Sequence, residues 1–334
     1  MRRGSIASLI GIGIVAGGIA AAVALALPWL PKPASKEADR IDPLFWFVII
    51  ICIVVFAVVI AVMTYSIIHF RAAPGDDSDG PPIHGHTNLE IVWTLIPTLL
   101  VTSIGIVSAI VLSRNDAVGA NVLRVNVTAQ QFAWSFSYPD AKGLTSGVLR
   151  LPKDRSVLLT FTAKDVIHSF WVPEFSQKED AVPGIATHLH ITPNRLGTFP
   201  VICTELCGLG HAVMRSHVDI VKPAVFAAWL KKGSQPASGS PGLAVFQQNG
   251  CAGCHTFKPA GATGTVGPDL DKLAAEAKQA NRGALAAFIE ESIVKPGAYI
   301  APGYPNGMPP TFGTTIPPDK LKQLVQYLAT GAKP

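Results

Sequence analysis

Residues 203–214 read Cys203-Thr204-Glu205-Leu206-Cys207-Gly208-Leu209-Gly210-His211-Ala212-Val213-Met214. Two thiols, an imidazole and a thioether so close together form a soft-ligand set, which suits copper. One thiolate with two histidines would make a blue-copper site, whereas two thiolates on one loop can bridge two metals, each of which needs its own imidazole. His211 provides one imidazole, and His168 is the natural second. A Cys203–Cys207 disulfide is the alternative.

The sequence around this loop predicts a β-domain over residues 121–232. Short segments of alternating character are broken by turn residues, which is typical of a β-sandwich or barrel. We expect His168 to project from an upstream strand. The clearest strands are Val122–Val127, Ser156–Phe161, His188–Ile191 and Gly197–Val201.

A second motif, Cys251-Ala252-Gly253-Cys254-His255, predicts a covalently attached c-type haem. Two thiols would form thioether bonds and the adjacent imidazole would bind the iron. A redox-active cysteine pair or a disulfide would not need His255 and would favour a βαβ surrounding, which the sequence does not indicate. Met308, in a Pro/Gly-rich loop, is the candidate second axial ligand.

The module that carries this motif, residues 242–334, is expected to be helical, with helices near Leu243–Asn249 and Pro318–Thr330. A Gly/Ser/Pro-rich linker over residues 233–241 precedes it. Such a linker spans only about 15–20 Å on average. The two modules are therefore expected to meet within one chain.

Three uncharged stretches, Ile6–Leu27, Phe45–Ile68 and Ile91–Leu112, are long enough to cross a membrane. The first follows two arginines and contains an A-x-A type cleavage site, so residues 1–27 are either a signal peptide, which we favour, or a retained anchor. The remainder predicts a two-helix transmembrane hairpin over residues 44–112, with spans at about 45–68 and 91–112.

The early arginines favour an N-terminus on the inner side, which places the chain after Asn115 outside. We therefore expect a multi-pass protein of a bacterial plasma membrane, with its copper and haem domains on the outer (periplasmic or extracellular) side. The net charge is only +5. The sequence has no run of Lys or Arg with interleaved aromatic residues, so it does not indicate nucleic-acid binding.

The string from Cys203 to Met214 resembles the binuclear copper site of subunit II of the haem–copper cytochrome c oxidases. The likeness extends over residues 40–230, which implies a cupredoxin-like fold for the β-domain. Residues 242–332 resemble class I cytochromes c, in which Gly267-Pro268-Asp269-Leu270 matches the loop beside the proximal histidine. The whole chain looks like subunit II of the caa type: a membrane-anchored multidomain protein with a transmembrane hairpin, a cupredoxin domain and an all-α cytochrome c domain.

The resemblance implies two copper ions, one covalent haem c and a magnesium ion shared with subunit I. Cys203 and Cys207 would bridge the coppers. The carboxylate of Glu205 would face the magnesium site. The implied copper ligands are His168, Cys203, the Glu205 carbonyl, Cys207, His211 and Met214, and the implied haem residues are Cys251 and Cys254 for attachment and His255 and Met308 as axial ligands.

Four further residues take roles only by this resemblance. Glu90 matches a glutamate at the mouth of a proton pathway into subunit I, although an acidic residue at a membrane boundary is often only interfacial. Asp180 matches a residue of the subunit interface. Relatives served by a soluble donor carry Gln-Trp-Tyr-Trp, whereas this chain has Gln131-Phe132-Ala133-Trp134. The electron would then enter through Phe132 and Trp134.

The implied function is that of subunit II of a proton-pumping cytochrome c oxidase. Electrons would pass from haem c through the copper pair to haem a of subunit I, where oxygen is reduced; this chain offers no catalytic residue for that step. Implied partners are subunits I and III and an external donor such as a cytochrome c or a cytochrome bc complex. The alternatives are the copper-bearing subunit of a nitric oxide reductase and a copper chaperone or redox sensor without turnover.

Overall fold

The computed structural model describes residues 3–72, 74–75, 80, 82, 84–119, 121–141, 143–233, 241–304 and 306–332. The chain forms two compact units: residues 1–31 with 39–115, and residues 32–38 with 116–334. The expected linker over residues 233–241 lies mostly outside the described residues.

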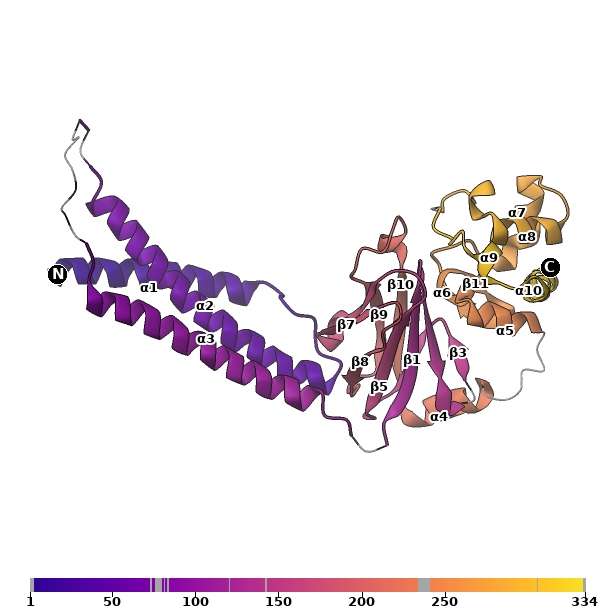
Figure 1. The fold of residues 1–334 in the computed structure, drawn as a ribbon, viewed down its shortest axis with the longest axis horizontal. Helices are drawn as coiled ribbons and strands as arrows, with labels where there is room; N and C mark the ends of the chain where they lie inside the picture. The colour runs from indigo at the N-terminus through magenta and orange to yellow at the C-terminus, as the bar shows by residue number, and fades with distance from the viewer. Residues whose placement is uncertain are drawn as a thin grey trace. The chain divides into compact units, whose positions relative to one another are not determined.

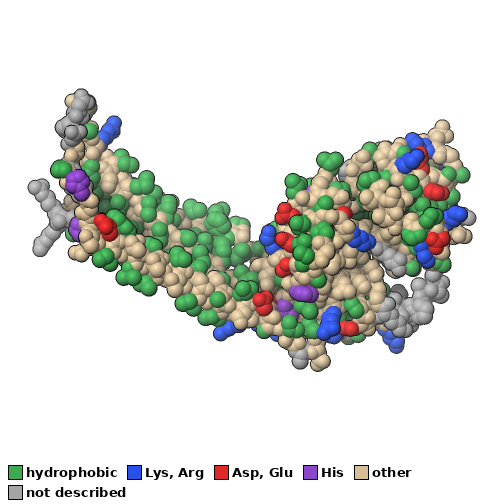
Figure 2. All heavy atoms as spheres, in the orientation of Figure 1, with side chains coloured by type: hydrophobic (Ala, Val, Ile, Leu, Met, Phe, Trp, Pro, Cys, Tyr) green, Lys and Arg blue, Asp and Glu red, His purple; other side chains and the backbone are tan. Residues whose placement is uncertain are grey.

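The first unit contains three long apolar helices (Figure 1): α1 (Arg3–Ala26), α2 (Lys36–His69) and α3 (Thr87–Asn115). Each is long and apolar enough to cross a membrane. Hydrophobic side chains cover these helices in Figure 2, as expected for a lipid-facing surface. The two helices of the expected hairpin are present as α2 and α3, but the described residues contain three candidate spans rather than two, because α1 is also long and apolar enough.

Small residues allow helix α1 to lie close to helix α2. A Cβ added to Gly17 of α1 would lie 3.3 Å from Cβ of Ala57, and one added to Gly13 would lie 3.6 Å from Cβ of Ala61. Glycine and alanine at such a spacing allow close helix contact in a membrane. The first uncharged stretch, expected as a signal peptide or an anchor, thus lies almost entirely within one helix of 24 residues.

The second unit begins with a β-domain of two five-stranded sheets, ordered β3-β2-β1-β5-β8 and β4-β10-β9-β6-β7. The four strands expected from the sequence are present as β1, β5, β8 and β9. The strands are β1 (Leu123–Gln130), β2 (Ala133–Tyr138), β3 (Leu144–Ser146), β4 (Leu149–Pro152), β5 (Val157–Ala163), β6 (His168–Val172), β7 (Gln177–Ala181), β8 (Thr187–Ile191), β9 (Gly197–Cys203) and β10 (Arg215–Val221).

The two sheets enclose one apolar core, which follows from the alternation of buried and exposed residues along strands such as β1. Phe170 on β6 is fully buried, with its ring centroid 5.5 Å from that of Trp134 and 5.2 Å from that of Phe161. Helix α4 (Pro223–Gly233) follows β10, and its Trp229 packs edge-on against Tyr138.

The C-terminal module, residues 241–332, is mainly helical, and the two helices expected there are present as α5 and α10. A separate apolar core fills it, centred on residues such as Phe246 and Leu324. Its elements are α5 (Pro241–Gln248), α6 (Cys251–Cys254), β11 (Thr256–Phe257), β12 (Ala262–Thr263), α7 (Leu273–Ala280), α8 (Leu285–Val294), α9 (Phe312–Thr315) and α10 (Pro318–Gly331).

Replacing Phe170 by Ala is expected to destabilise the β-domain by about 3–5 kcal/mol, because the change leaves a cavity among packed aromatic rings. Denaturant unfolding of the detergent-solubilised chain, followed by tryptophan fluorescence, measures the effect. The control is Leu196→Ala at an exposed turn position, where a change within about 0.5 kcal/mol is expected. Equal effects of the two substitutions would contradict this account of the core.

Candidate functional site

Strand pairing brings the two ends of the cysteine loop together. Cys203 is the last residue of β9, and Met214 directly precedes β10, its antiparallel partner. The backbone N–H of Cys203 donates to the carbonyl of Met214 at 3.3 Å. Strand β6 also pairs with β9, with Phe170 opposite Cys203, so that His168 at the start of β6 lies beside the loop.

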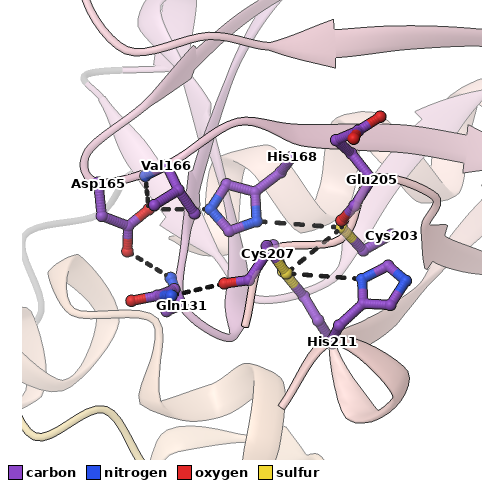
Figure 3. Close-up of polar contacts among 9 residues, drawn as sticks. Gln131, Asp165, Val166, His168, Cys203, Glu205, Cys207 and His211 are labelled. Carbon is purple, nitrogen blue, oxygen red and sulfur yellow. Dashed lines mark hydrogen bonds and ion pairs between the residues drawn. The ribbon is translucent and has the colours of Figure 1, made fainter. Parts of the chain in front are cut away.

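The side chains of this loop converge on one buried cluster (Figure 3). The two sulfurs, Cys203 Sγ and Cys207 Sγ, lie 3.8 Å apart, and both cysteines are free. Nδ1 of His168 is 3.9 Å from Cys203 Sγ, and Nδ1 of His211 is 3.6 Å from Cys207 Sγ. Sδ of Met214 is 3.8 Å from Cys207 Sγ. The structure thus brings together all five predicted side chains and forms no Cys203–Cys207 disulfide.

Glu205 contributes its backbone to the cluster. Its carbonyl oxygen is 3.4 Å from Cys203 Sγ, whereas Figure 3 shows its carboxylate directed away from the two sulfurs. The carbonyl and the carboxylate of one residue are therefore available to different partners.

The pKa values of the Cys203 and Cys207 thiols are shifted in opposite directions. Burial alone would raise the pKa of Cys203, but hydrogen bonds with His168 and the neighbouring backbone lower it to about 6. Burial and the negative charge of Cys203 raise the pKa of Cys207 to about 12. Two thiolates at this separation repel each other strongly unless a cation lies between them. With two imidazoles and a thioether at hand, the donor set fits soft metal ions such as copper.

A carboxylate that the sequence analysis missed orients one imidazole. Oδ1 of Asp165 is 2.9 Å from Nε2 of His168, which leaves Nδ1 on the side of the sulfurs. Burial would raise the pKa of Asp165, but hydrogen bonds from the backbone of Gln131 and from His168 lower it. Metal-binding histidines commonly have such a carboxylate partner. The only sequence signal was its position three residues before His168.

The second cysteine pair lines an apolar cavity of the C-terminal module. The cavity has an empty volume of about 1280 Å³, part of it open to solvent, and is lined by Cys251, Cys254, His255, Met308 and Phe246 among others. Burial, and for Cys251 the charge of Cys254 as well, raises the pKa of the Cys251 thiol to about 12, and burial raises that of Cys254 to about 11.

His255 is held in a single orientation in this cavity. Its Nδ1 lies 2.8 Å from the carbonyl oxygen of Pro268, and burial lowers the pKa of the imidazole. A neutral imidazole that donates from Nδ1 presents Nε2 as a free ligand. Pro268 lies beside His255 as the resemblance implied. A haem therefore fits the cavity, with His255 and Met308 among the lining residues.

Four other predicted residues lie outside both clusters. Glu90 is exposed in the first turn of α3, where its carboxylate accepts a hydrogen bond from the backbone of His86 at 3.1 Å. Phe132 is half-buried, and its ring fills the space above Gly210, where an added Cβ would overlap it. Trp134 is fully buried, with its ring centroid 6.2 Å from that of His168. Asp180, on β7, is exposed.

The fold and the two clusters define a membrane-anchored protein that joins a copper-type Cys/His cluster in a β-domain to a haem-type module. Three family descriptions match the chain: the transmembrane domain of cytochrome c oxidase subunit II over residues 22–111, its periplasmic domain over residues 145–221, and cytochrome c over residues 240–332. The chain belongs to the cytochrome c oxidase subunit II family.

Similar proteins include three that are named cytochrome c oxidase subunit 2. The protein from Thermostichus vulcanus is 33% identical, over 61% of this chain and 78% of its own length. The protein from Synechocystis sp. is 33% identical over 60% of this chain and 74% of its own length. The protein from Alkalihalophilus pseudofirmus is 34% identical over 70% of this chain and 71% of its own length.

Replacing Gly267 by Ala is expected to displace the imidazole of His255, because the added Cβ would lie 2.6 Å from its Cε1 and 2.9 Å from its Nδ1. We expect loss of the low-spin haem spectrum or a changed haem potential, measured on the purified chain. Gly297→Ala is the control, since its Cβ would meet only Asn306 at an ordinary 3.6 Å. Unchanged haem spectra and potential in the Gly267 variant would refute the positioning of His255 described above.

Proposed function

We propose that this chain is subunit II of a proton-pumping cytochrome c oxidase with a built-in electron donor. The observation that carries the proposal is the presence, in one chain of this family, of the buried cluster around Cys203 and Cys207 and of the haem cavity around His255. Haem c and a binuclear copper centre would be the electron carriers of this chain, and haem a of subunit I would be the acceptor. When bound, these groups supply one-electron chemistry, and oxygen reduction belongs to subunit I.

The residues of the copper cluster are assigned by their donor atoms. Cys203 and Cys207 would together hold two copper ions, since one imidazole lies beside each sulfur. His168, His211, Met214 and the Glu205 carbonyl complete the set. The carboxylate of Glu205 is left to a magnesium ion at the boundary with subunit I. Strand pairing holds Cys203 beside Met214 and His168, and ligands fixed in this way would need little rearrangement during electron transfer.

Cys251 and Cys254 attach one haem c, with His255 and Met308 as axial ligands. The side of the haem module that carries Cys254 contacts the β-domain, because Cys254 Sγ is 4.0 Å from the carbonyl oxygen of Phe132. Small residues allow close approach at one place in this contact, where a Cβ on Gly147 would lie 2.7 Å from the backbone nitrogen of Gly253. Phe132, with Trp134 buried behind it, is the point at which electrons enter the copper domain.

The membrane helices also have proposed roles in the complex. Helices α2 and α3 anchor the chain against subunit I, Glu90 lies at the mouth of a proton pathway, and Asp180 lies at the subunit interface. The copper and haem domains face the outer side of a bacterial plasma membrane. Partners are subunits I and III and an external donor such as a cytochrome c or a cytochrome bc complex. Helix α1 is retained as a third span, which is supported by its close contact with α2 at Gly17 and Ala57.

The purified complex is expected to contain one haem c, haem a and about three coppers, two of them in this chain. Replacing Cys207 by Ser removes a bridging sulfur and should abolish the two coppers of this chain while leaving haem c in place. Metal analysis and optical spectra of the complex measure both quantities. A complex with b-type haems and non-haem iron would instead support the nitric oxide reductase alternative, whereas fast haem-to-copper transfer would argue against a copper chaperone or redox sensor.

Cleaving the linker, for example at a protease site inserted near Pro236, is expected to slow electron entry into the copper centre. The linker keeps the haem module at an effective concentration on the order of millimolar, which dilution removes after cleavage. Flash-induced electron transfer at low protein concentration measures the rate. An uncleaved chain with the same insertion is the control, and equal rates before and after cleavage would contradict the built-in donor.

A further inference from the structure

Gln131 lies in the turn between β1 and β2, and its polar groups reach both halves of the copper-type cluster (Figure 3). Its side-chain Nε2 donates to the carbonyl oxygen of Cys207 at 2.5 Å. Its backbone N–H donates to Oδ2 of Asp165 at 2.6 Å. The other oxygen of Asp165 contacts His168. One residue therefore holds the backbone of one bridging cysteine and, through a carboxylate, the ring of one imidazole.

The residues on either side of Gln131 face the C-terminal module. Nε2 of Gln130 donates to the carbonyl oxygen of Asn249 at 3.2 Å, two residues before Cys251. The carbonyl of Phe132 is the atom near Cys254 Sγ. The turn Gln130–Phe132 thus contacts the haem module with its flanking residues and the copper ligands with its central one.

The cysteine loop is shaped to receive this turn. A Cβ on Gly208 would lie 2.8 Å from Nε2 of Gln131 and 3.3 Å from the Phe132 ring. Gly208 also has a φ of +126°, which favours glycine. A side chain at this position would push the Gln131 carboxamide away from the carbonyl of Cys207, so the close contact depends on the glycine.

We propose that Gln131 is a positioning residue, which fixes Cys207 and His168 relative to each other and links their geometry to the turn that receives the haem module. This inference rests on the proposed binuclear copper centre. A hydrogen bond to the Cys207 carbonyl limits rotation of the backbone that carries the sulfur. The carboxylate bridge to His168 keeps Nδ1 on the side of the metal. Both constraints reduce the rearrangement of ligands when the centre changes its redox state.

The test replaces Gln131 by Met, which has a similar length but no donor, in the full-length chain. Copper affinity is expected to fall by about 10–100-fold, as is typical when an outer contact of a metal ligand is lost. The optical and paramagnetic spectra and the potential of the copper centre are expected to change as well. Affinity is measured by competition with a copper chelator, independently of oxidase activity.

The matched control is Gln130→Met, which removes the bond to Asn249 and leaves the bonds of Gln131. This variant should keep wild-type copper affinity and spectra but transfer electrons from haem to copper more slowly. Should Gln131→Met fail to fold by circular dichroism, Gln131→Asn withdraws the donor by one methylene and gives the same comparison.

The outcomes separate the inference from its premise. Wild-type chain that does not bind two coppers would contradict the proposed function itself. Wild-type chain with two coppers, together with Gln131 variants of unchanged affinity, spectrum and potential, would overturn the positioning role alone. Changed spectra in the Gln130 variant as well would show that the whole turn is only a packing element.

Discussion

The structure depends most on the placement of two cysteine sulfurs 3.8 Å apart in a nearly dry environment. Two charges at that distance, removed from water, cannot both persist without a compensating cation. The pKa values show the same repulsion: the pKa of Cys203 is lowered, and the negative charge of its thiolate helps to raise the pKa of Cys207. A metal ion resolves the conflict. This requirement explains why imidazole and thioether groups surround the sulfurs.

Backbone pairing holds both ends of the loop that carries these sulfurs. Cys203 ends β9, Met214 directly precedes the antiparallel strand β10, the two are joined by a hydrogen bond, and β6 contributes His168 from the neighbouring position in the same sheet. Phe170 and Trp134 fill the core directly beneath. A centre built on strand ends above a packed core can hold its ligands more precisely than a free loop could.

The surroundings of each cysteine determine the pKa of its thiol. Cys203 lies among hydrogen-bonding partners, and its pKa falls. Cys251 and Cys254 lie against apolar residues, and their pKa values rise. Only Cys203, whose hydrogen-bonding partners stabilise the thiolate, has a lowered pKa, whereas burial raises the pKa values of the other three. The turn Gln130–Phe132 contacts both places and is therefore one physical connection between the two domains.

The sequence by itself determined the ligand types, the haem motif and the major strands, because these depend on residue chemistry and short-range spacing. It predicted the cluster around Cys203 and the helices α5 and α10, but it counted two spans, whereas the described residues form three apolar helices, with Gly17 of α1 close to Ala57 of α2. Only the tertiary structure revealed Asp165 and Gln131 beside the predicted copper ligands. Their roles depend on the juxtaposition of the β1–β2 turn, the segment before β6 and the cysteine loop, and no local pattern encodes that juxtaposition.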